Sequence, residues 1–243
     1  MRTLVMIALA AALLSASFAA GGVPEGLGRK EAEALRQLER RSGGALEVQW
    51  HDQANTPAVL RGALTRPSAH TPEWVVFGFL ESVKPLYGLN RPREQMQVTD
   101  VVKSKDGSAE VRLRRMLYGV PVWGDTLNVR IDRDGVIREV RGRMHPHLER
   151  HTFRLRKHAK VTERQALAAA MAAAEARGLV YDAVEVEHYY LPTEPGTPLV
   201  YAVQFKRERE GGAGGRAEAA AGEQAHERTV VFIHALTGRT IEN

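Results

Sequence analysis

A histidine-rich stretch is the first place in the chain where the residue types suggest metal or phosphate chemistry. It holds four imidazoles among four cationic side chains: His145, His147, His151, His158, Arg150, Arg154, Arg156 and Lys157. Imidazoles are good zinc ligands, but neighbouring cations repel a metal ion and no cluster of carboxylates accompanies these histidines. We therefore expect a solvated basic connector, which would also be able to dock an acidic protein surface and speed association.

Patterns typical of hydrolases are absent from the sequence. A zinc peptidase needs His-Glu-x-x-His, because two histidines four residues apart share a helix face beside a glutamate that activates water. The nearest match begins at His226-Glu227, but position 230 is Val230. The chain has no cysteine, no Gly-x-Ser-x-Gly and no phosphate-binding loop. We expect a protein that is not an enzyme and that has no catalytic residue, metal or cofactor.

Residues suited to contact with a partner protein fall in two places. The first set lies in and around a predicted pair of strands: Arg112, Tyr118, Pro121 and Asp125. Interfaces favour Tyr and Arg, although a turn, a cross-strand pair and an edge proline would account for the same residues. The second set is a predicted C-terminal strand: Thr240, Ile241, Glu242 and Asn243. An extended segment of this kind can add backbone hydrogen bonds at the edge of a cleft.

The composition is that of a soluble globular protein with one large or two small units. The 243 residues are 44% hydrophobic, and 34 Lys+Arg against 29 Asp+Glu give a formal charge of +5. The charges are dispersed, and no basic face interleaved with aromatic residues is visible, so we do not expect nucleic-acid binding.

The N-terminus has the pattern of a secretory signal at residues 1–19. Arg2 precedes an uncharged apolar run from Leu4 to Leu14, and Ser17-Phe18-Ala19 offers small residues for cleavage after Ala19. The run is shorter than the roughly 20 residues that span a bilayer. We expect a secreted, periplasmic or cell-envelope protein with no stable membrane span after cleavage. Residues 20–44 then form a tail and a helix over 29–41.

The central residues predict a helix followed by an antiparallel sheet. Thr71-Pro72-Glu73 begins a helix that reaches about Tyr87, and Gly88 ends it. A pair of strands at 45–50 and 58–64, joined by an Asp-Gln-Ala-Asn-Thr-Pro turn, is predicted before this helix. After the helix, strands at 98–102, 109–117, 122–131 and 136–143 alternate apolar and polar residues and are separated by Asp-Gly and Tyr-Gly turns. One face of this sheet is expected to pack on the preceding helix.

A second unit of the same kind follows. Thr162 to Gln165 is a capping box, which begins an Ala-rich helix that runs to about Arg177 and ends at Gly178. Strands are predicted at 184–191, 199–206, 229–234 and 240–243, with a flexible insertion at 207–227 that is rich in Gly, Ala and Glu. The fold class is α+β: two subdomains, at 45–150 and 151–243, each a helix on an antiparallel sheet and cystatin-like in character.

The stretch from Ser104 to Asp125, with its Gly119-Val120-Pro121-Val122, resembles the core motif of the fungalysin/thermolysin propeptide family. Downstream, Leu199-Val200-Tyr201 and the run from Val231 to Gly238 are similar to the PepSY unit that follows this motif in the family. The family's His and Gln are Glu110 and Arg115 here, which predicts that any buried polar network is rebuilt as a Glu/Arg pair. Without His-Glu-x-x-His, the chain resembles a stand-alone pro-region that lacks the metalloprotease catalytic domain.

The resemblance implies a chaperone and inhibitor that acts in trans on a thermolysin-type metalloprotease. The terminal strand and the paired strands from Leu113 to Leu127 are the expected blocking elements. Two alternatives remain at this point. One is an envelope ligand-binding or sensory module of PepSY type with no protease partner, and the other is the truncated remnant of a zymogen.

Overall fold

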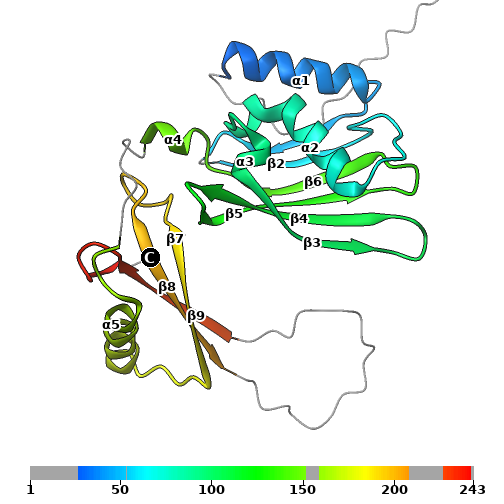
Figure 1. Cartoon of the computed structure of the whole chain (residues 1–243). Helices are drawn as coiled ribbons and strands as arrows, with labels where there is room; N and C mark the ends of the chain where they lie inside the picture. The colour runs from blue at the N-terminus through cyan, green and yellow to red at the C-terminus, as the bar shows by residue number, and fades with distance from the viewer. Residues whose placement is uncertain (1–26, 53, 152–158, 208–226, 242–243) are drawn as a thin grey trace, which may run out of the picture.

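The computed structural model describes residues 27–52, 54–151, 159–207 and 227–241 (Figure 1). Its helices are α1 (Arg29–Arg41), α2 (Pro72–Val83), α3 (Pro92–Gln95), α4 (Leu148–His151) and α5 (Glu163–Ala176). Its strands are β1 (Glu47–Trp50), β2 (Pro57–Arg61), β3 (Met96–Lys103), β4 (Ala109–Leu117), β5 (Val120–Ile131), β6 (Ile137–Arg143), β7 (Ala183–Tyr190), β8 (Leu199–Arg207), β9 (Glu227–His234) and β10 (Thr240–Ile241). The fold is mixed α+β, with much strand and few helices.

Six strands form the first sheet, in the order β1-β2-β6-β5-β4-β3, and every pairing in it is antiparallel. The predicted meander from β3 to β6 is confirmed. Its alternation follows from the sequence, since Val111 and Leu113 of β4 are buried whereas Arg112 between them is exposed. The Asp-Gly turns at Gly107 and Gly135 have positive φ angles of 86° and 74°, which glycine adopts without steric cost.

Helices α1, α2 and α3 lie over one face of the first sheet (Figure 1). Thr71 caps α2 through its side chain, and Val76, Phe79 and Leu80 of α2 join the buried cluster on the sheet. The α-helix is shorter than predicted, because Pro85 lacks an N–H and cannot continue it. A 3-10 turn at Lys84–Tyr87 follows, and a left-handed Gly88 ends it as expected.

Strands β7 to β10 form the second sheet, which is antiparallel and joins the first through one parallel bridge from Val122 of β5 to Tyr190 of β7. Helix α5 packs on one face of it through Ala166, Ala170 and Ala174. The capping box at Thr162 is confirmed, with Gln165 bonding back to the Thr162 N–H. Ala166, Ala170 and Ala174 recur every four residues, so they lie on one side of α5.

Three predicted features lie wholly or mostly outside the described residues: the signal peptide at 1–19, the insertion at 207–227, and Glu242 with Asn243. Within the described ranges, no helix is long and apolar enough to cross a bilayer.

Candidate partner surface at the junction of the two sheets

Arg112 lies on the face of the first sheet that carries no helix. Its side chain is 55% exposed, and its Nε lies 3.2 Å from Glu110 Oε1. A longer contact of 4.0 Å joins its Nη1 to Asp100 Oδ2. The residue is therefore accessible, but its guanidinium already belongs to a surface ion-pair network.

Tyr118 and Pro121 lie at the hairpin that joins β4 to β5. Tyr118 occupies the tight turn with a positive φ of 51° and is 47% exposed. Its ring meets Tyr190 of the second sheet edge-on, with centroids 6.3 Å apart. Pro121 is half-buried and pairs with Met116 across the hairpin. Both predicted residues thus lie where the two sheets meet.

Asp125 is not a surface residue, and its predicted role as a partner contact is wrong in this conformation. Its side chain has 0% exposure and lies 3.6 Å from Nη1 of Arg115, which is equally buried. The backbone N–H of His145 donates to Asp125 Oδ2 at 3.0 Å, and the His145 ring Nδ1 lies 2.6 Å from Oδ1. The carboxylate is thus satisfied internally and has no free face for a partner.

Arg115 is the centre of this buried polar cluster. Its Nη1 donates to the backbone carbonyl of His145, and its Nη2 lies 3.2 Å from Glu149 Oε1 on α4. Gln95 of α3 also donates to Glu149. Two carboxylates therefore share one guanidinium, which ties β4 and β5 to the segment that leads toward the second sheet.

The predicted pairing of Glu110 with Arg115 does not occur. Residues an odd number of positions apart in a strand point to opposite faces of the sheet, and Glu110 and Arg115 are spaced in this way. The register of pairing between β4 and β5 also shifts between Arg114 and Met116. Glu110 instead accepts a hydrogen bond from Asn128 at 2.8 Å, and this bond, followed by that from Arg112, lowers its pKa below the ordinary value. Glu110 and Arg115 therefore belong to two separate networks.

The C-terminal strand β10 is an edge strand of the second sheet. Thr240 and Ile241 pair with Ile233 and Phe232 of β9, and Ile241 packs against the apolar face that α5 does not cover. The described part of the predicted contact segment is thus the outermost strand of the second sheet, and an edge strand can accept another strand.

An aromatic group on this face was missed by the sequence analysis. We call it the aromatic face: Trp123, Tyr189, Phe232, Val230 and Ile241. The Trp123 ring meets Tyr189 and Phe232 edge-on, with centroids 4.9 Å and 5.0 Å apart. A signal for it exists in β8, where Val200 and Ala202 are buried as fully as their neighbours. A strand that is apolar on both faces of the sheet needs packing partners on both faces.

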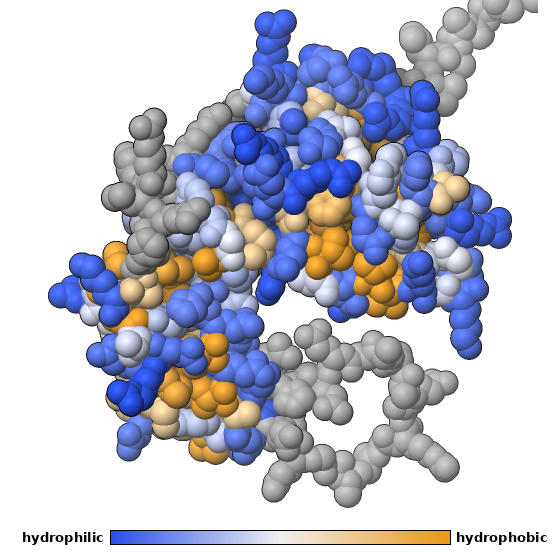
Figure 2. All heavy atoms as spheres, in the orientation of Figure 1, coloured by the Kyte–Doolittle hydropathy of each residue, from blue (hydrophilic) through white to orange (hydrophobic). Residues whose placement is uncertain are grey.

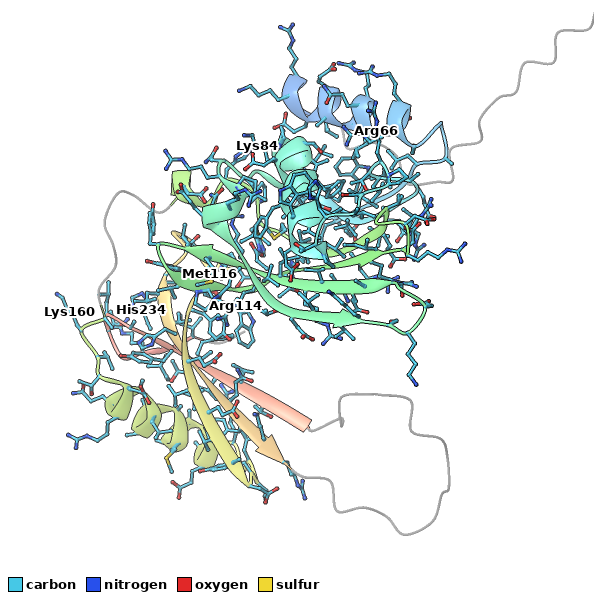
Figure 3. All side chains as sticks on the ribbon, turned by 45° about the vertical axis from the view of Figure 1, so that its right-hand side comes forward. Arg66, Lys84, Arg114, Met116, Lys160 and His234 are labelled. Carbon is cyan, nitrogen blue, oxygen red and sulfur yellow. The ribbon has the colours of Figure 1, made fainter. Side chains whose placement is uncertain are left out.

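Charged groups border the aromatic face. Burial and then a hydrogen bond to Glu187 raise the pKa of the Tyr189 phenol, which stays neutral, and the charge of Arg114 acts in the opposite direction. Figure 3 shows Arg114 and Met116 at the angle between the two sheets. Figure 2 shows apolar atoms reaching the surface in the part of the molecule that holds the second sheet. Aromatic residues bordered by arginine are typical of protein interfaces.

The histidine-rich stretch is only partly the solvated connector that was expected. His145 is mostly buried and bound to Asp125, whereas residues 152–158 lie outside the described ranges. Among the residues that the structure describes, no group of three or more His, Asp or Glu side chains is arranged to hold a metal ion.

Comparison with known proteins finds a propeptide motif in the first sheet. The Fungalysin/Thermolysin Propeptide Motif matches residues 94–144, which span β3 to β6. Among solved structures, an uncharacterized protein from Eubacterium rectale ATCC 33656 aligns with 87% of this chain and 81% of its own, at 8% identity and a TM-score of 0.41.

Two curated relatives share sequence with the chain. Bacillolysin of Bacillus cereus is 29% identical over 104 residues, which are 42% of this chain and 18% of the relative. Bacillolysin of Brevibacillus brevis is 25% identical over 165 residues, which are 65% of this chain and 31% of the relative. The match thus spans under a third of either relative. The motif is that of a propeptide rather than a catalytic domain, and together with the bacillolysin similarity it fits a propeptide of a thermolysin-type protease.

Proposed function

We propose that this chain is a non-catalytic, exported pro-region that binds a thermolysin-type metalloprotease in trans, assists its folding and blocks its cleft. The observation that carries the proposal is the propeptide motif at residues 94–144, whose β4–β5 hairpin ends at the junction of the two sheets. The exposed hairpin tip and the partly buried aromatic face together have the composition that protein interfaces favour.

The same proposal divides the chain into an FTP-like subdomain at 45–150 and a PepSY-like subdomain at 151–243. Separate buried clusters beneath α1 and α2 and beneath α5 support this division, and Leu117, Val122 and Leu148 of the first subdomain join the second cluster. A binder that touches a folding protease with both subdomains would stabilise its folding transition state, which lowers the barrier to a native state that is otherwise slow to form.

Two elements are proposed to make the contact. The edge of the second sheet at Thr240 and Ile241 offers backbone hydrogen bonds to an extended strand at the cleft. The hairpin tip at Tyr118 offers an aromatic anchor that is exposed before binding and becomes buried on binding. Arg112 lies on the open face of the first sheet and contributes charge at the rim, where it affects the association rate more than the affinity.

The proposal is tested with denatured thermolysin-type protease that is diluted into native buffer with and without the purified chain. The chain is expected to raise the yield of folded protease, measured as activity after the chain has been removed. Tyr118→Ala is expected to weaken the effect at least about tenfold in required concentration, as for an aromatic anchor. The matched control is Val180→Ala, at an exposed apolar residue far from the hairpin. Equal yields with and without the chain would refute the proposal.

A further inference from the structure

A groove lined with arginine lies between α1, α2 and the segment that follows β2. It consists of two adjoining hollows of about 710 Å³ and 520 Å³, which share Arg41, Thr65, Arg66 and Pro67. Figure 3 shows Arg66 close to α1, on the side of the molecule away from the second sheet. The groove is thus separate from the hairpin tip and the aromatic face.

The groove has an unbalanced positive charge. Four arginines line the larger hollow: Arg40, Arg41, Arg66 and Arg138. In the described part of the chain, neither hollow is lined by a carboxylate. Arg40 and Arg138 are neutralised from outside, by Glu33 at 3.4 Å and Asp132 at 2.6 Å. Arg41 and Arg66 are exposed and form no ion pair with any described residue. Two guanidinium groups are therefore available to an anionic ligand.

The other end of the groove is aromatic. Trp74, at the first turn of α2, is 51% exposed, although a residue of its size is usually mostly buried. The His70 ring lies against it, with the ring centroids 3.9 Å apart and the planes tilted by 32°. Phe79 lines the same hollow as Trp74, so this end of the groove can bury an apolar or aromatic side chain of a ligand.

The wall of the groove is held in place by the first sheet. The Ser68 N–H donates to the carbonyl of Asp134 at 3.0 Å, and Thr65 Oγ1 accepts from the N–H of Ile137 at 2.9 Å. The contact at the turn is close, since a Cβ added to Gly135 would lie 1.9 Å from the Ser68 carbonyl oxygen. A site that is formed before its ligand arrives avoids the entropic cost of ordering itself on binding.

We propose that this groove binds an extended acidic segment of a partner protein. Carboxylates of the segment pair with Arg41 and Arg66, and an apolar or aromatic side chain stacks on Trp74. The charge selects an anion, and the two hollows, of about 710 Å³ and 520 Å³, hold more than a single phosphate. The aromatic end, a short distance from the free arginines, fits a peptide in which carboxylates and apolar side chains alternate. The inference does not depend on the protease role.

The test uses a short fluorescein-labelled peptide with alternating glutamates and one tyrosine, and its anisotropy is followed as the chain is added. Binding is expected for this peptide and not for the same peptide with lysine at each glutamate, and salt is expected to weaken it. The double variant R41E/R66E is expected to weaken binding by at least about a hundredfold, or tenfold for each charge reversed. The variant R164E/R177E changes the net charge equally at exposed arginines around α5 and is expected to stay within about twofold.

Equal loss in both double variants would overturn the inference, because it would show attraction by net charge alone. Tighter binding of inorganic phosphate or single-stranded DNA than of the acidic peptide would overturn it as well. Circular dichroism checks folding, and if R41E/R66E is misfolded, R41Q/R66Q and Trp74→Ala serve instead, each with an expected loss of at least about tenfold. No protease is present in this assay, so its outcome is independent of the refolding test.

Discussion

Replacing Arg115 by Met removes the buried guanidinium that lies 3.6 Å from the buried Asp125 carboxylate. Met keeps most of the side-chain volume, so the change tests charge rather than cavity formation. Asp125 would retain its two hydrogen bonds to His145, and Glu149 would turn toward solvent, since its side chain is already 22% exposed. The main cost is therefore one partly compensated buried charge.

Breaking a buried ion pair by removing one partner costs about 3–5 kcal/mol. The remaining bonds to His145 place R115M near the lower limit, at about 3 kcal/mol of the free energy of unfolding. The double variant R115M/D125N leaves no orphaned charge. We therefore expect it to be less destabilised than the sum of the single variants, by about 2 kcal/mol.

Urea unfolding followed by far-UV circular dichroism measures both values. With a slope of about 2–3 kcal/mol/M, R115M is expected to lower the midpoint by about 1 M. The control is R130M, at an arginine that is 69% exposed on the adjacent strand, with an expected change within about 0.5 kcal/mol. A loss below about 1 kcal/mol for R115M, or additive single variants, would refute the buried-charge reasoning.

Three further outcomes follow from the structure. Thr162→Ala removes the helix cap and is expected to cost about 1 kcal/mol, seen as a lower thermal midpoint. Burial raises the pKa of Glu139, but the hydrogen bond from Arg61 and the charges of neighbouring arginines lower it by more, so the net shift is downward. The stabilisation by the Glu139 carboxylate is complete above the ordinary glutamate pKa and is lost as pH falls through the lowered value. Glu139→Gln should therefore make stability less sensitive to acid, and an unchanged acid limb would contradict this. Gly88→Ala puts a Cβ 2.6 Å from Pro146 Cα, so about 3 kcal/mol is expected, against about 1 for Gly119→Ala, where the space is open; equal costs would contradict the clash.

The helices and strands were largely predictable, because each has a local cause. Alternation and Asp-Gly turns define β3 to β6, and a threonine side-chain cap marks the start of α2 and of α5. The point where α2 ends was missed because the apolar stripe continues to Tyr87, while Pro85 breaks the backbone hydrogen bonding beneath it. The end of α2 is set by the missing N–H of Pro85, which side-chain periodicity does not reveal.

The candidate site was less predictable, because its contacts join distant segments. Arg115 shares the alternation of Val111 and Leu113, so its burial was visible in the sequence as a charged residue in apolar register. Its partner Asp125 likewise shares the alternation of Leu127. The remaining partners lie in α3 and in the segment after β6, whose positions no periodicity fixes. The aromatic face depends on one bridge between sheets, which is likewise a non-local contact.

The most direct test of the central claim is the rate at which a thermolysin-type metalloprotease cleaves a small fluorogenic peptide as the purified chain is added in increasing amounts. We predict saturable inhibition in which the chain stays intact on gels, and in which Tyr118→Ala shifts the curve to higher concentration while Val180→Ala does not. Full protease activity at every concentration, or a chain that is digested as an ordinary substrate, would contradict the account.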